Sequence, residues 1–128
     1  MKSRQLPGVA LAALALLGCD GQQYVSPDTA LLSVSHDTTG SKLVSRCNYV
    51  PVLLGSQVDR HYAVDGGLEV FITLTRDDIT VTFQDDGQML DPFHVTTKEL
   101  EAGVVADPSA PAGYTAELSR ACAPDDDP

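Results

Sequence analysis

Paired aspartates are the most prominent reactive side chains in this sequence of 128 residues. Asp77 stands beside Asp78, and Asp85 stands beside Asp86 and a glycine. Carboxylate oxygens bind Ca²⁺ when two loops bring several of them together. The ligand spacing of a dedicated calcium loop is missing, however, and Asp and Gly are also the residues that tight turns favour. We therefore predict turns at these positions and no metal site, with the four aspartates as the weak metal candidates.

Three histidines, His36, His61 and His94, are available as general bases. They are scattered singly along the chain. The Gly-x-Ser-x-Gly and Ser-x-x-Lys motifs that place a nucleophile beside a base are missing from the sequence. A pair of glycosidase carboxylates would need a cleft on a larger scaffold. We therefore predict a protein that is not an enzyme, with no catalytic residue and no cofactor.

The N-terminal residues form an export pattern. Lys2 and Arg4 precede the uncharged apolar residues 9–17, a run shorter than the roughly 20 residues that cross a bilayer. The run ends in Leu16-Leu17-Gly18-Cys19, which resembles the signal peptides of bacterial lipoproteins. The resemblance implies cleavage before Cys19 and a diacylglyceryl group on its thiol. The alternatives are an ordinary secretory signal or a buried apolar segment of a cytosolic domain.

The lipoprotein resemblance places the protein in the bacterial cell envelope, exported and lipid-anchored. Asp20 resembles the residue that retains lipoproteins in the inner membrane of enteric bacteria, but the rule differs between lineages. The choice between the inner and the outer membrane therefore stays open. Residues 20–28 are polar and contain Gly and Pro, so we predict a tether with a maximum reach of about 30 Å.

Two cysteines, Cys47 and Cys122, remain as an even pair once Cys19 is acylated. Exported proteins fold where disulfides persist, so we predict a bridge between them. The alternatives are two free thiols or a metal pair. Neither cysteine belongs to a Cys-x-x-Cys motif, so the spacing does not support a metal.

The charge of the chain is strongly acidic, with 18 acidic and eight basic side chains. Removal of Lys2 and Arg4 with residues 1–18 leaves six basic side chains against 18 acidic ones, a net charge of −12 with histidine neutral. Nucleic acids and anionic headgroups are poor partners for such a surface because both repel it.

Alternation of apolar and polar residues predicts β-strands in the body of the chain. Residues 68–75 and 79–84 alternate most clearly, and Arg76-Asp77-Asp78 between them predicts a hairpin turn. Further strands are predicted at residues 31–35, 43–54, 57–64, 103–106 and 113–120. Residues 96–103 fit two alternatives, a short helix with a capping box from Thr96 to Glu99 or a strand with a polar approach.

About seven short strands separated by turn residues are typical of a small antiparallel β-sandwich, so we predict an all-β fold. Residues 111–116, Pro-Ala-Gly-Tyr-Thr-Ala, resemble the approach to a late strand of immunoglobulin domains. The sequence has no Trp, and Ala116 stands where that family has Cys, so we predict the immunoglobulin-like architecture and not the superfamily. The domains are a signal peptide at 1–18, a lipidated cysteine and tether at 19–30, the sandwich at 31–122 and an acidic tail at 123–128.

These features together indicate binding work at a membrane surface. We expect a non-catalytic accessory, scaffold or protein-binding subunit of an envelope assembly for transport, secretion, polysaccharide or motility. Its partners would be the bilayer, through acylated Cys19, and a membrane-associated protein. The alternatives are a small-ligand or calcium-binding lipoprotein and, less favoured, a small hydrolase or a protease inhibitor.

Overall fold

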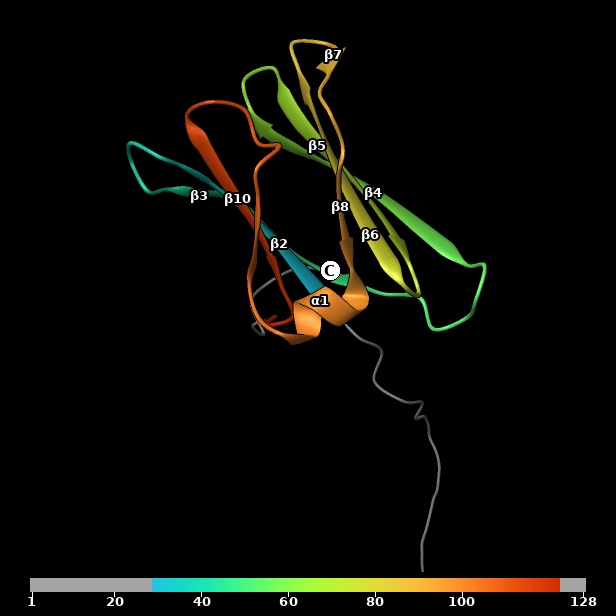
Figure 1. Ribbon diagram of the computed structural model, residues 1–128. Helices are drawn as coiled ribbons and strands as arrows, with labels where there is room; N and C mark the ends of the chain where they lie inside the picture. The colour runs from blue at the N-terminus through green and yellow to red at the C-terminus, as the bar shows by residue number, and fades with distance from the viewer. Residues whose placement is uncertain (1–28, 123–128) are drawn as a thin grey trace, which may run out of the picture.

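The computed structural model describes residues 29–122, which form nine strands and one short helix (Figure 1). The elements are β2 (Thr29–His36), β3 (Lys42–Tyr49), β4 (Gln57–Asp65), β5 (Leu68–Thr75), β6 (Asp78–Asp85), β7 (Gln88–Met89), β8 (Phe93–Thr96), α1 (Thr97–Glu101), β9 (Val105–Asp107) and β10 (Tyr114–Ser119). No helix among these residues is long and apolar enough to cross a membrane.

The strands form two antiparallel sheets that face each other, as predicted for a β-sandwich (Figure 1). One sheet has the order β3-β2-β10-β9, and the other has the order β4-β5-β6, with both β7 and β8 paired to the second edge of β6. The described residues contain nine strands where about seven were predicted. The sequence pattern missed β7 and β8 because they are too short to show a clear alternation.

The β5–β6 hairpin supplies the centre of the core, and its prediction is confirmed. Every second residue of each strand is buried: Leu68, Val70, Ile72 and Leu74 on β5, and Ile79, Val81 and Phe83 on β6. The facing sheet contributes Leu32 and Val34 of β2 and Leu118 of β10, all fully buried. Because side chains alternate between the two faces of a strand, each strand buries one apolar row between the sheets.

Three strand boundaries differ from the prediction by two residues or more. β3 ends at Tyr49 and does not continue to Leu54, because Pro51 cannot donate to a strand ladder and a turn follows, closed by the Ser56 N–H on the Leu53 carbonyl at 3.1 Å. β2 begins at Thr29, two residues before the predicted strand at 31–35. β9 covers Val105–Asp107, later than the predicted 103–106.

The helical alternative for residues 96–103 is the one observed. Thr96 caps α1: its side chain accepts from the Glu99 N–H at 3.0 Å, and the Glu99 carboxylate accepts from the Thr96 N–H at 2.8 Å. Leu100 of α1 is buried in the core. The short helix connects β8 of one sheet with β9 of the other (Figure 1).

The loops between the antiparallel strands lie at two opposite ends of the sandwich, which we call proximal and distal. The proximal end, where β2 begins, holds the β3–β4 connection (residues 50–56), the β5–β6 turn, α1 and the residues after β10 (Figure 1). The distal end holds the turns after β2, β4 and β6. Each loop is thereby assigned to one end by the direction of its strands.

Candidate functional site

The predicted disulfide is present between Cys47 and Cys122, with a Cα–Cα distance of 5.6 Å. Cys47 lies on β3 and Cys122 follows β10, and these two strands flank β2. The bridge therefore closes across three neighbouring strands of one sheet. The bridge of an immunoglobulin domain instead joins the two sheets. Cys19, the predicted lipidation site, lies outside the described residues.

The aspartate pairs lie at opposite ends of the sandwich. Asp77 and Asp78 are at the start of β6, and Asp85 and Asp86 are at its end. An eight-residue strand separates the pairs by roughly 23 Å, since a strand rises about 3.3 Å per residue. A shared calcium site built from both pairs is therefore excluded, and no group of three metal-binding side chains occurs within residues 29–122. Asp86 has a positive φ of 54°, which fits its prediction as a turn residue.

The three histidines are separate from one another. His36 packs edge-on against Tyr114, with ring centroids 5.5 Å apart, at the distal end. His61 stacks on Phe71 at 4.3 Å, and its Nε2 lies 2.5 Å from Glu69. β5 and β6 lie between the strands of His61 and His94, β4 and β8. Three strand spacings of about 4.8 Å place the backbones of the two histidines roughly 14 Å apart.

His94 has a possible nucleophile beside it, since its Nδ1 lies 2.9 Å from the Thr80 hydroxyl. Both residues lie on the outer face of the sheet, and His94 is exposed. A nucleophilic mechanism also needs an acid that orients the base and a site that excludes water. Neither residue lines the groove or the cavity described below.

A groove lies where both sheets end, on the side of β7, β8 and β9. It has a volume of about 570 Å³ and is lined by residues 88–93 together with Pro108 and Ser109. Met89 is 54% exposed there, and Leu90 and Phe93 pack partly into the core. Within residues 29–122, β8 pairs with β6 alone and β9 with β10 alone, so each sheet ends near the groove in a strand with an unpaired edge. The sequence pattern did not single out this groove, because chain segments from two sheets form it.

A buried carboxylate belongs to the strand that borders this groove. Asp107 of β9 is 5% exposed, and its Oδ1 accepts hydrogen bonds from the N–H and the hydroxyl of Ser109 at 2.8 and 2.6 Å. Burial raises the pKa of Asp107, although the Ser109 hydrogen bonds oppose this effect. The Asp107-Pro108-Ser109 sequence is the signal that could have identified this turn.

A smaller cavity of about 370 Å³ lies at the proximal end, between α1 and the residues after β10. Leu100, Val104 and Arg120 are among its lining residues. The Arg120 guanidinium donates to the Thr97 carbonyl at 2.9 Å and lies 3.6 Å from the Glu101 carboxylate. Both contacts hold α1 against the end of β10, so this cavity belongs to the packing of the helix.

The β3–β4 connection carries the two most exposed large apolar side chains of residues 29–122, Leu53 and Leu54. Val52, Leu53 and Leu54 are 61%, 69% and 74% exposed. The Leu53–Ser56 turn places Gly55 at its third position with φ +89°, a conformation that favours glycine. Leu53 and Leu54 therefore project at the tip of a tight turn.

Comparisons with protein-family models, curated proteins and solved structures return no match for this chain.

Proposed function

We propose that this protein is a lipid-anchored, non-catalytic accessory subunit of an envelope assembly, and that it holds a membrane-associated protein at the groove beside β7, β8 and β9. The anchor is the acyl group predicted on Cys19. The observation that carries the binding role is the groove itself, which chain segments of both sheets form and which the exposed Met89 lines. Surface grooves and exposed strand edges are where β-sheet proteins accept partner segments.

The groove also indicates the chemistry of the partner segment. Pro92 and Pro108 lack N–H groups, and β8 has only four residues, so side-chain contacts would contribute more than strand addition. Asp91 lines the groove, and the chain has a net charge of −10. A segment that combines apolar and basic side chains is therefore the complementary partner.

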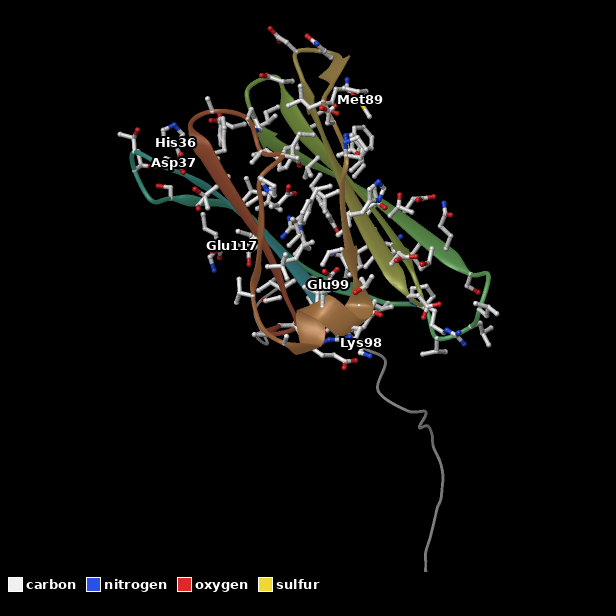
Figure 2. The ribbon with its side chains drawn as sticks, viewed as in Figure 1. His36, Asp37, Met89, Lys98, Glu99 and Glu117 are labelled. Carbon is white, nitrogen blue, oxygen red and sulfur yellow. A yellow bond between two sulfur atoms is a disulfide. The ribbon has the colours of Figure 1, made fainter. Side chains whose placement is uncertain are left out.

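Photo-cross-linking in cells tests this proposal. A photoreactive amino acid replaces Met89 in the groove, and the matched control carries it at Glu117, which is exposed on the outer face of the other sheet (Figure 2). We expect one dominant cross-linked envelope protein from position 89, none from position 117, and loss of the product in the Cys19→Ser variant. Intact membranes that yield no specific product from position 89 would contradict the proposal.

A further inference from the structure

Exposed apolar side chains are concentrated at one end of the molecule. Within residues 29–122, six large apolar side chains are exposed, and five of them lie at the proximal end: Tyr49, Val52, Leu53, Leu54 and Val104. Only Met89 lies near the distal end (Figure 2). Scattered single apolar residues are normal on protein surfaces, but Val52, Leu53 and Leu54 are consecutive, and a continuous exposed apolar segment is typical of an interaction surface.

The β3–β4 connection is held firmly at its base. Val50 is 3% exposed, and the neighbouring Asn48 is 2% exposed. The Asn48 amide donates to the Ala30 carbonyl at 3.3 Å and accepts from the Tyr62 hydroxyl of the other sheet at 2.7 Å. Burial raises the pKa of Tyr62, so its hydroxyl stays protonated and donates at neutral pH. The turn that presents Leu53 and Leu54 therefore has a fixed base, which lowers the entropy lost when it binds.

Charged side chains are also distributed unequally between the proximal and the distal end. Residues 47–58 contain no charged side chain, although 20% of the whole chain is charged. The turns of the distal end contain or adjoin four aspartates, Asp37, Asp65, Asp85 and Asp86, and one cation, Lys42. The proximal end carries three cations, Arg76, Lys98 and Arg120, beside the acidic Asp77, Asp78, Glu99 and Glu101. An anionic surface therefore repels the distal end more than the proximal end.

The predicted anchor belongs to the proximal end as well. Nine residues lie between Cys19 and Thr29, so the ten steps from one Cα atom to the next span at most about 36 Å. Thr29 is paired with Tyr49, the last residue of β3 before the exposed turn. A lipid on Cys19 would therefore be attached through the end of the sandwich that also carries the turn at Leu53.

We propose that Val52, Leu53 and Leu54 insert into the surface of the bilayer beside the lipid anchor. This inference rests on the acylation of Cys19, which is part of the proposed function. An uncharged apolar turn inserts to about the boundary between headgroups and acyl chains, as interfacial helices do. The contact orients the sandwich with its proximal end on the membrane and its acidic distal end away from it.

Tryptophan fluorescence tests the contact, because the natural chain contains no Trp. The full-length lipoprotein is purified from bacterial membranes as Leu53→Trp, and as Met89→Trp for a matched exposed control. Each is reconstituted into phosphatidylcholine vesicles without other proteins, and a second set of vesicles carries bromine on the acyl chains. We expect a blue-shifted emission and quenching by bromine for Leu53→Trp, and neither effect for Met89→Trp.

Flotation of the same vesicles separates the two proposals. Protein that floats with the vesicles while Leu53→Trp stays unquenched would overturn the insertion and leave the anchor intact. Protein that does not float would overturn the anchor and the insertion together. Replacing Val52 and Leu54 by Ser in the Leu53→Trp chain should reduce the quenching without changing flotation. A protein occupant of the turn would give no quenching in these vesicles.

Discussion

Asp107 is the only buried carboxylate among residues 29–122. Its Oδ1 is satisfied by Ser109, whereas its Oδ2 has no hydrogen-bond partner. A buried carboxylate oxygen without a partner favours the protonated, neutral acid. The raised pKa of Asp107 thus follows from its position on β9, between the two sheets.

The free energy of unfolding should depend on pH through the ionisation of Asp107. The pKa of Asp107 is higher in the folded state than the ordinary value of 3.8. The protonated carboxyl therefore contributes to the free energy of unfolding, and this contribution is complete below pH 3.8. That contribution is lost as the pH rises through the folded-state value. We expect Asp107→Asn to gain stability relative to the natural chain between pH 3 and pH 7, measured by urea unfolding.

The control for this experiment is Glu117→Gln, on an exposed strand position of the same sheet. A surface substitution of this kind changes stability by less than about 0.5 kcal/mol. If the difference between Asp107→Asn and the natural chain is the same at pH 3 and pH 7, the assigned role of Asp107 is wrong.

Among the elements, α1 shows how a local motif decides between two structures. The Thr96 to Glu99 capping box occurs in the sequence, but a strand with a polar approach fitted the same residues. The helix forms because both capping hydrogen bonds are made and because Leu100 is buried in the core. Packing of one apolar side chain therefore stabilises a helix of five residues that is too short to be stable alone.

Removal of the cap should destabilise the domain. Thr96→Ala takes away the oxygen that accepts from the Glu99 N–H, which costs about 1 kcal/mol at an N-cap. Thr96→Ser keeps that oxygen, so we expect it to restore most of the loss in the free energy of unfolding. Urea unfolding measures both variants. Equal destabilisation by Ala and Ser would show that the cap hydrogen bond is not the cause.

At the scale of the whole molecule, the Cys47–Cys122 bridge restrains most of the domain. The two cysteines are 75 residues apart in the sequence. In the chain-entropy account, a crosslink over a loop of this length destabilises the unfolded state by about 4 kcal/mol. The bridge also holds β3 and the end of β10 on either side of β2, where the domain begins.

Reduction should therefore lower the free energy of unfolding by about 4 kcal/mol. Urea unfolding with and without a thiol reductant measures this difference. The Cys47→Ser/Cys122→Ser double variant is the control, and its stability should not respond to the reductant. A natural chain whose unfolding midpoint is unchanged by reduction would contradict the expected stabilisation.

The sequence by itself determined the elements with clear local patterns. Period-two alternation identified β5 and β6 with their buried rows, because the side-chain direction in a strand depends only on position. The alternation also predicted the all-β class. The pairing of Cys47 with Cys122 was predicted separately, from the assignment of Cys19 to a lipid. Pro51 is a sequence signal for the end of β3, but the apolar residues after it led to the prediction of a longer strand.

Only the tertiary structure decided which loops meet. The aspartate pairs are near in sequence but lie at opposite ends of β6, whereas Asn48 and Tyr62 come together from two sheets. The exposed end at Leu53 and Leu54 and the groove beside Met89 likewise depend on strand direction and on sheet order. Strand direction and sheet order arise from packing between segments far apart in the chain, and local patterns carry no record of that packing.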